Sequence, residues 1–285
     1  MDRSRVVARS ALYVPGDQPG KLAKALLRGA DAIIVDLEDA VPPDRKDAAR
    51  RAVADWLAGV RPGDGEVWIR VNPGPLRDAD VRAVALAAAV TGLCLAKTEG
   101  PDEVAEAAGL LASLGSAAVL SPLLESAAAV LAAPGIARAP RVARLQVGEA
   151  DLAAELGIEP GQDEAELLWV RSHVVLASAA AGIDPPLGPA SPNFADLAAF
   201  ERSTRALRRL GYRGRACIHP AQVSVTNQVF TPAAEEVERA RRVIAVAATA
   251  GGAAVADGDG TMIDEAVVRS ARRVLALSEA VHPAS

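Results

Sequence analysis

Titratable side chains stand at or just after the ends of short apolar segments in this sequence. The stretch ADAIIVDLEDAV, residues 30–41, ends in a group of acids, Asp36, Glu38 and Asp39. An apolar run of this length is typical of a buried strand. The same position relative to an apolar run is taken elsewhere by Arg70, Lys97, Glu125, Asp151 and His219. Any one of these residues alone fits a solvated strand end, but their recurrence indicates a shared polar site.

Two of these acids suit a divalent cation. Glu125 and Asp151 follow separate apolar segments, and Mg²⁺ takes oxygen ligands, with one or two carboxylates and the remaining positions left to water and substrate. No His or Cys cluster has the spacing of a zinc site. His173, within an apolar helix-like segment, is more typical of a packed histidine than of a metal ligand.

The basic residues of the set suggest an anionic partner. Arg70 precedes the turn VNPG, and a rigid arginine is suited to bidentate binding of a carboxylate. An ion pair of Arg70 with Glu38 or Asp39 is an alternative that is compatible with this role. His219 is followed by Pro220, and a site role and a structural hydrogen bond at a strand end suit it equally well.

The elements that must position these residues alternate between strand-like and helix-like segments. Apolar runs occur at 11–15, 32–37, 67–71, 92–97, 117–125, 144–148, 185–190 and 216–220. Eight such repeats in about 220 residues predict an α/β fold, a (β/α)₈ TIM barrel. No glycine-rich dinucleotide fingerprint follows the first run, which disfavours an open doubly wound sheet. In a barrel, the residues at the carboxyl ends of the strands meet at one mouth.

The intervening helices have recognisable start and stop signals. We expect helices after Asp17, ending at Gly29, and after Asp44, ending at Gly59. The chain beyond the last strand predicts a long helix, a glycine-rich loop and another helix. We therefore expect a barrel domain over residues 1–230 and a C-terminal helical extension over 231–285 that acts as a lid, with the glycine-rich ADGDG at 256–260 giving it flexibility.

Composition excludes several classes of protein. The chain has 285 residues, 51% hydrophobic and 3% aromatic, and a formal net charge of −5, with no Lys/Arg block, so we expect no nucleic-acid partner. Cys94 and Cys217 stand alone, which fits a reducing compartment. No signal-peptide-like segment opens the sequence and no apolar run is long enough to span a bilayer, so a cytoplasmic location is expected.

Several segments together resemble a known family. They occur in order along nearly the whole chain: SALYVPGDQPGKLAKALLRGADAIIVDLEDAV, IRVNP, LAKTE, LLES, GEADL, GRACIHPAQ and DGTMIDEAVVRSARRVL. This pattern is similar to the citrate lyase beta-subunit-like acyl-CoA lyases, which include malyl-CoA and citramalyl-CoA lyases. LEDAV and IHPAQ are its most specific parts. The resemblance implies a TIM barrel with a C-terminal helical lid, in homotrimers or hexamers.

The resemblance also implies roles for individual residues. Mg²⁺ would be bound by Glu125 and Asp151, and the substrate carboxylate by Arg70, with the substrate site completed by Glu38, Asp39 and Lys97. Asp264, supplied by a neighbouring subunit, would be the general acid/base. From the residues alone, Asp264 is better explained as the N-cap of the last helix.

Two features depart from the family pattern. The order GEADL places Ala150 directly before Asp151, where an acid is usual, and LAKTE lacks the proline that commonly precedes the lysine.

The implied reaction is a Claisen-type cleavage of a 3-hydroxyacyl-CoA thioester into an acyl-CoA and a 2-oxoacid. Coenzyme A carries phosphates, so a basic patch is required, and Lys21, Lys24 and Arg28 at helical spacing are candidates; an ordinary solvated helix face suits them equally well. The alternatives are a citrate lyase beta subunit acting on an acyl-carrier-protein thioester, a pyruvate-type class II aldolase, and a barrel that has lost catalysis and serves in binding or assembly.

Overall fold

Eight parallel strands form a closed barrel in the computed structural model of this protein, which describes residues 8–249, 255–256 and 262–281. The strand order follows the sequence, and the last strand pairs with the first. The strands are β1 Ser10–Pro15, β2 Ala32–Asp36, β3 Glu66–Val71, β4 Val90–Leu95, β5 Val119–Leu124, β6 Gln146–Val147, β7 Leu187–Gly188 and β8 Gly214–Cys217. The predicted TIM barrel is confirmed.

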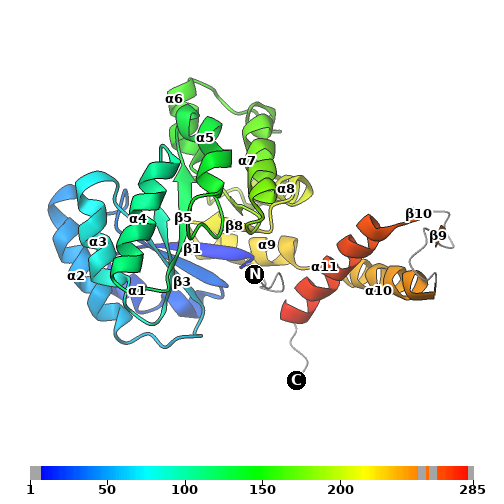
Figure 1. Ribbon diagram of the computed structural model, residues 1–285, viewed down its shortest axis with the longest axis horizontal. Helices are drawn as coiled ribbons and strands as arrows, with labels where there is room; N and C mark the ends of the chain where they lie inside the picture. Colours follow the sequence, from blue (N-terminus) through cyan, green and yellow to red (C-terminus); the bar gives the residue numbers. More distant parts are fainter. Residues whose placement is uncertain (1–7, 250–254, 257–261, 282–285) are drawn as a thin grey trace. The chain divides into compact units, whose positions relative to one another are not determined.

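Helices follow the strands and surround the barrel (Figure 1). They are α1 Pro19–Leu22, α2 Lys46–Leu57, α3 Arg77–Val84, α4 Pro101–Ser113, α5 Ala127–Ala137, α6 Glu149–Leu156, α7 Leu168–Ala181, α8 Leu197–Leu210 and α9 Pro220–Phe230. Short 3₁₀ turns are η1 Ala25–Arg28, η2 Pro43–Arg45, η3 Gly74–Leu76 and η4 Ala165–Leu167. None of the described helices is long and apolar enough to cross a membrane.

Two of the helix starts predicted from the sequence are wrong. The expected helix after Asp17 is instead the four-residue α1 followed by η1, and Asp17 accepts a hydrogen bond from Arg45 rather than capping the helix. Asp44 lies within η2, and helix α2 begins after it without a side-chain cap. In both cases a proline near the predicted start begins a separate short turn, because its fixed φ angle suits a first helical position.

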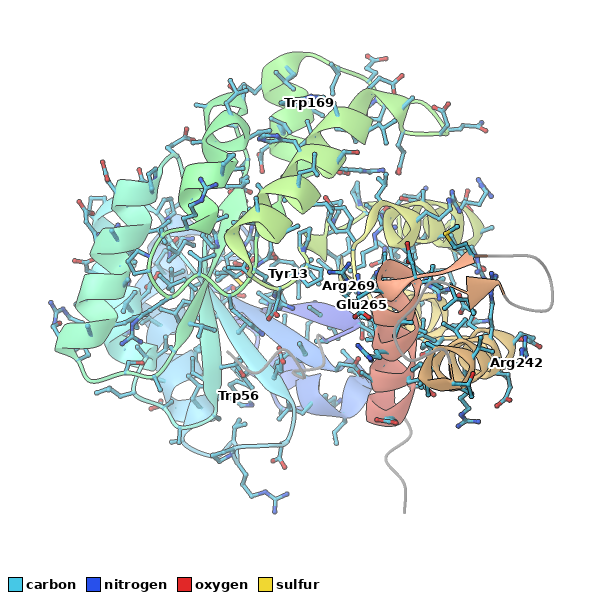
Figure 2. All side chains as sticks on the ribbon, turned by 45° about the vertical axis from the view of Figure 1, so that its right-hand side comes forward. Tyr13, Trp56, Trp169, Arg242, Glu265 and Arg269 are labelled. Carbon is cyan, nitrogen blue, oxygen red and sulfur yellow. The ribbon has the colours of Figure 1, made fainter. Side chains whose placement is uncertain are left out.

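The strands have two apolar faces. Successive side chains point alternately inward and outward, so Ile33 and Val35 of β2 join the large core between strands and helices, while Ala32 and Ile34 join a smaller cluster. The smaller cluster also contains Trp68, Cys94 and Ala216, from β3, β4 and β8. Figure 2 shows Tyr13 among the strands and Trp169 at the outer edge of the barrel helices.

The same alternation determines which side chains reach the barrel mouth. Inward-facing positions recur every second residue along a strand. The next inward position after Ile34 in β2 is therefore Asp36, and the next after Trp68 in β3 is Arg70. β2 and β3 pair in register, with Asp36 opposite Arg70. The last inward positions of β2 and β3 therefore present polar groups side by side at the carboxyl end of the barrel.

The chain beyond the barrel forms a second compact unit, which starts at residue 229. Helices α10 Ala234–Thr249 and α11 Glu265–Val281 pack together, and the strands β9 Val255–Ala256 and β10 Met262–Ile263 pair antiparallel between them. Their core is a small cluster of Ala240, Val243, Ile263, Val268 and Ala271. Residues 257–260 of the predicted flexible loop lie outside the described residues, and the lid function stays a prediction.

Candidate active site

A cavity of about 830 Å³ opens at the carboxyl ends of the barrel strands. This volume lies within the usual range for small-molecule sites. The three residues on which the sequence-based site depends, Arg70, Glu125 and Asp151, all line it, although they are far apart along the chain. Asp39, Lys21, Lys24, Arg28 and His219 line it as well.

Arg70 is held by the acids that follow β2. Its Nε donates to Asp36 Oδ1 at 2.7 Å and its Nη2 donates to Asp36 Oδ2. Nη1 lies 3.1 Å from Glu38 and 3.6 Å from Asp39. Burial lowers the pKa of Arg70, but the bonds to Asp36 outweigh burial and raise it above its ordinary value. Arg70 is thus a fixed cation whose orientation is set mainly by Asp36.

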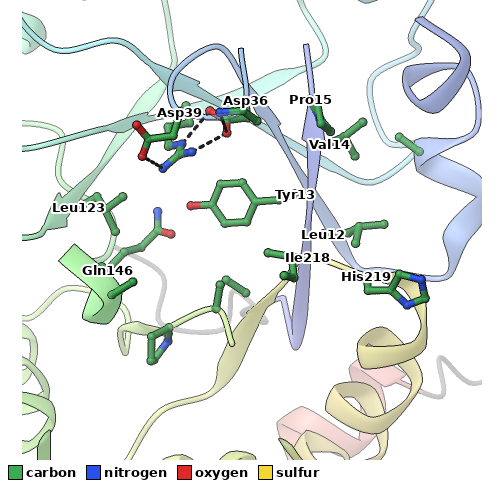
Figure 3. Close-up of a pocket in the computed structure, with 18 of the residues that line it drawn as sticks. Leu12, Tyr13, Val14, Pro15, Asp36, Asp39, Leu123, Gln146, Ile218 and His219 are labelled. Carbon is green, nitrogen blue, oxygen red and sulfur yellow. Dashed lines mark hydrogen bonds and ion pairs between the residues drawn. The ribbon is translucent and has the colours of Figure 1, made fainter. Parts of the chain in front are cut away.

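Asp36 is itself fixed by the backbone. It is buried, and its two oxygens also accept the N–H groups of Glu38 at 2.8 Å and Ala40 at 3.2 Å. These bonds form because the chain turns sharply after β2. Figure 3 shows Asp36 and Asp39 at one side of the cavity, with dashed lines for their bonds to Arg70.

Glu125 is a buried carboxylate that points into the cavity from the end of β5. Its Oε2 accepts the backbone N–H of Lys97 at 2.7 Å. The backbone of Lys97, which donates this bond, is in the left-handed conformation, with φ 49°. This conformation is uncommon for residues other than glycine, and residues that adopt it cluster at functional sites. Burial raises the pKa of Glu125 to about 7, against the opposing effect of Lys97. A bound divalent cation would favour the charged carboxylate instead.

Glu38 and Lys97 do not line this cavity. Lys97 Nζ lies 3.3 Å from Glu38 Oε1 and 3.8 Å from Asp39. Burial raises the pKa of Glu38, while Arg70 opposes the shift. Burial also acts to lower the pKa of Lys97, but nearby carboxylates, with Glu125 first among them, raise it overall. Their predicted substrate contacts stay predictions. In the structure Glu38 pairs with Arg70 and Lys97, and Lys97 also contacts Asp39 and Glu125.

Gly148 makes room for the Glu125 side chain. A Cβ atom added at residue 148 would lie 2.6 Å from Glu125 Cγ and 2.7 Å from Glu125 Oε1. Any other residue there would push the carboxylate aside. The glycine of GEADL is therefore required by the position of Glu125 in the preceding strand.

Replacing this glycine should weaken metal binding without removing a ligand. We expect Gly148→Ala to lower Mg²⁺ affinity by about 10- to 100-fold, the usual effect of disturbing a group that orients a metal ligand. Calorimetric titration with Mg²⁺ measures it. Gly109→Ala is the matched control, because nothing lies within 4 Å of the added Cβ in helix α4. Equal Mg²⁺ affinity in the two variants would show that Glu125 tolerates the methyl group.

The donor set of the cavity fits a hard divalent cation. Of the carboxylates that line it, Asp36 and Asp39 pair with Arg70, and Glu149 pairs with Arg171. Glu125 and Asp151 form no ion pair within the described part of the chain. No group of three or more His, Cys, Asp or Glu side chains suited to a metal is found among the described residues. A carboxylate pair of this kind fits Mg²⁺ better than zinc.

Asp151 and Glu149 lie on the first turn of α6, which begins directly after β6. Glu149 accepts two hydrogen bonds from the buried Arg171, at 2.6 and 2.7 Å. Of the two acids in GEADL, Glu149 is therefore turned toward Arg171 of α7, while Asp151 is exposed at the cavity.

Three further basic residues and His219 line the same cavity. Lys21 is in α1, Lys24 precedes η1 and Arg28 ends it, and all three side chains are exposed. His219 follows β8, where its Nδ1 accepts the Ala221 N–H at 3.2 Å and its ring stacks on Phe194 at 5.0 Å. The structural hydrogen bond considered for His219 is therefore present, and it coexists with a position at the cavity.

Asp264 caps helix α11, as the residues alone indicate. Its Oδ1 accepts the Val267 N–H at 2.9 Å and its side chain is exposed. This geometry belongs to the second compact unit and does not test a catalytic role.

Three cavity residues were missed as site candidates by sequence reasoning. Asp36 was noted only as part of the acid cluster, and Tyr13 and Gln146 were counted as strand residues. The signal that finds them is the alternation of β1, β2 and β6, which turns each of them inward. The two cysteines are buried and free, as expected.

Comparisons with known proteins agree with this architecture. The family model described as HpcH/HpaI aldolase/citrate lyase matches residues 9–220. The chain is 31% identical to the citrate lyase subunit beta of Leuconostoc mesenteroides subsp. cremoris, over 96% of this chain and 94% of that protein. It is 34% identical to a (3S)-malyl-CoA thioesterase of Cereibacter sphaeroides, over 96% and 95% of the two chains.

A solved structure is similar over nearly the whole chain. It is protein CitE from Mycobacterium tuberculosis in complex with magnesium, acetoacetate and coenzyme A. The TM-score is 0.78 at 30% identity, and the match covers 94% of this chain and 97% of that one.

Proposed function

The chain belongs to the HpcH/HpaI aldolase/citrate lyase family, and from that premise we propose that it is a Mg²⁺-dependent carbon–carbon lyase of 3-hydroxyacyl-CoA thioesters. The substrate is of the malyl-CoA or citramalyl-CoA type, and the products are an acyl-CoA and a 2-oxoacid. The observation that carries the proposal is the pair Glu125 and Asp151, the lining carboxylates of one cavity that have no ion pair in the described part of the chain.

Mg²⁺ held by Glu125 and Asp151 would supply Lewis-acid polarisation at the oxygens of the oxoacid half. Arg70 binds and orients the carboxylate of that half, since Asp36 fixes its guanidinium at the cavity wall. Asp39, Glu38 and Lys97 stabilise this arrangement around Arg70. The similar CitE structure is in complex with magnesium and acetoacetate, which supports a site that takes a metal and a small oxoacid.

Proton transfer requires a group beyond the barrel. Asp264 of a neighbouring copy would transfer the proton to or from the reacting carbon, and general acid/base catalysis requires it to come within hydrogen-bond reach of that proton. The proposal therefore includes a homo-oligomer, a trimer or hexamer, in which the C-terminal unit acts as a lid on the barrel of the next subunit.

The coenzyme A part is assigned to the basic side of the cavity. Lys21, Lys24 and Arg28 provide exposed positive charge there, in a protein whose net charge is −5. Phosphates are attracted by such a local patch even on an acidic protein. The similar CitE structure is in complex with coenzyme A, which supports coenzyme A as part of the substrate.

A panel of thioesters tests the function. Malyl-CoA and citramalyl-CoA are assayed for release of the 2-oxoacid, with Mg²⁺ and after treatment with EDTA. We expect cleavage of at least one thioester, loss of at least 99% of the activity with EDTA, and recovery when Mg²⁺ is restored. Cleavage that continues unchanged in EDTA would contradict the metal-dependent mechanism.

One other function has a specific observation in its favour. The relative from Leuconostoc mesenteroides subsp. cremoris is named citrate lyase subunit beta, so an acyl-carrier-protein thioester is a second candidate substrate. The panel therefore also includes an acyl-carrier-protein thioester, which tests the citrate lyase beta-subunit function. A free hydroxyacid in the same panel tests the class II aldolase function.

A further inference from the structure

Tyr13 occupies a central place in the cavity that none of the roles above explains. Its side chain turns inward from β1, and the Arg70 guanidinium carbon lies 5.2 Å from the centre of its ring. Figure 3 shows the hydroxyl pointing across the cavity toward the side where Leu123 and Gln146 lie. The ring thus supports Arg70, and the oxygen extends beyond it into the space that a ligand would fill.

The hydroxyl of Tyr13 forms no hydrogen bond in the described part of the chain. Tyrosine hydroxyls enclosed by protein usually find a partner. The other tyrosine follows this rule, since the Tyr212 hydroxyl donates to the Arg171 carbonyl at 3.4 Å. A polar group without a partner at a cavity wall indicates that a ligand supplies the partner.

The neighbouring donors are already engaged. The Nε and Nη2 atoms of Arg70 donate to Asp36, and Nη1 lies near Glu38 and Asp39. Gln146 Nε2 donates to Ser121 Oγ at 2.8 Å and to Cys94 Sγ at 3.1 Å. An anion beside Arg70 would therefore gain its charge but few directed hydrogen bonds.

We propose that the Tyr13 hydroxyl binds the substrate by donating a hydrogen bond to an oxygen of the oxoacid half, beside Arg70. The inference rests on the proposed function and adds a substrate-binding residue to it. A neutral donor suits this place, because it gives direction without adding charge next to the Arg70–Asp36 pair. Burial raises the pKa of Tyr13 above its ordinary value, so the hydroxyl keeps its proton throughout the range of ordinary assays.

The test is the affinity for a free oxoacid, which does not depend on turnover. Pyruvate is titrated calorimetrically into the Mg²⁺-saturated protein. We expect Tyr13→Phe to weaken pyruvate binding by about 10- to 100-fold, the usual loss for one hydrogen bond to a charged group. The affinity for Mg²⁺ alone and the melting temperature should match those of the wild type.

Tyr212→Phe is the matched control, since it removes a tyrosine hydroxyl that does not line the cavity. It should bind pyruvate as the wild type does. Equal pyruvate affinity in Tyr13→Phe and wild type would overturn this inference and leave the proposed function intact. A wild-type protein that neither binds pyruvate nor cleaves a thioester would overturn both.

Discussion

Glu125→Gln should abolish both Mg²⁺ binding and thioester cleavage. The change keeps the size of the side chain and an oxygen that can accept the Lys97 N–H, but removes the negative charge from the buried ligand. Loss of the Lewis acid removes several kcal/mol of transition-state stabilisation, and about 4 kcal/mol corresponds to a thousandfold in rate. We therefore expect kcat/KM to fall by about a thousandfold or more.

Calorimetric titration with Mg²⁺ and the thioester assay measure the two effects on the same preparation. Glu155→Gln is the matched control, because Glu155 lies on α6 like Asp151 but is not part of the cavity wall. Its Mg²⁺ affinity and activity should be those of the wild type. Glu125→Ala should behave as Glu125→Gln does. Undiminished Mg²⁺ affinity in both Glu125 variants would refute the metal site.

Asp264→Asn should separate the two roles of Asp264. Asparagine caps a helix about as well as aspartate, so the bond to the Val267 N–H is retained and the protein should melt at the wild-type temperature. Asparagine cannot transfer the proton, and general acid/base catalysis contributes about 10²- to 10⁴-fold. We expect kcat for thioester cleavage to fall by that factor, while Mg²⁺ and pyruvate binding stay unchanged.

Asp196→Asn provides the matched control, since Asp196 caps α8 through the same kind of bond, to the Ala199 N–H at 2.9 Å. It should be fully active. If Asp264→Asn is also fully active, and Asp264→Ala loses only about 0.5–2 kcal/mol of stability, then Asp264 is a capping residue and the general acid/base lies elsewhere.

The barrel could be predicted because its strands are short apolar runs with helical segments between them. The predicted strands at 144–148 and 185–190 are longer than the observed β6 and β7, because each of these strands pairs over only two residues. The helix after Asp17 was wrong because Pro19 starts a turn that does not continue. Local sequence signals therefore identified these elements but not where they begin and end.

The site was predicted in part for the same reason. Glu125, Asp151 and Arg70 stand at strand ends, and strand ends meet at the barrel mouth. Asp36 and Tyr13 were within reach of sequence reasoning, because period-2 alternation turns them inward. The close approach of Gly148 to Glu125 and the left-handed backbone of Lys97 were not, since both depend on contacts between strands that no local pattern encodes.

The proposed site makes one claim that a single measurement tests most directly: the metal and the oxoacid share one site. Pyruvate is titrated calorimetrically into the wild-type protein with saturating Mg²⁺ and again in EDTA. The proposed site predicts that pyruvate binds only with Mg²⁺, and by reciprocity that Mg²⁺ binds more tightly in the presence of pyruvate by the same factor. Equal pyruvate affinity with and without the metal would contradict it.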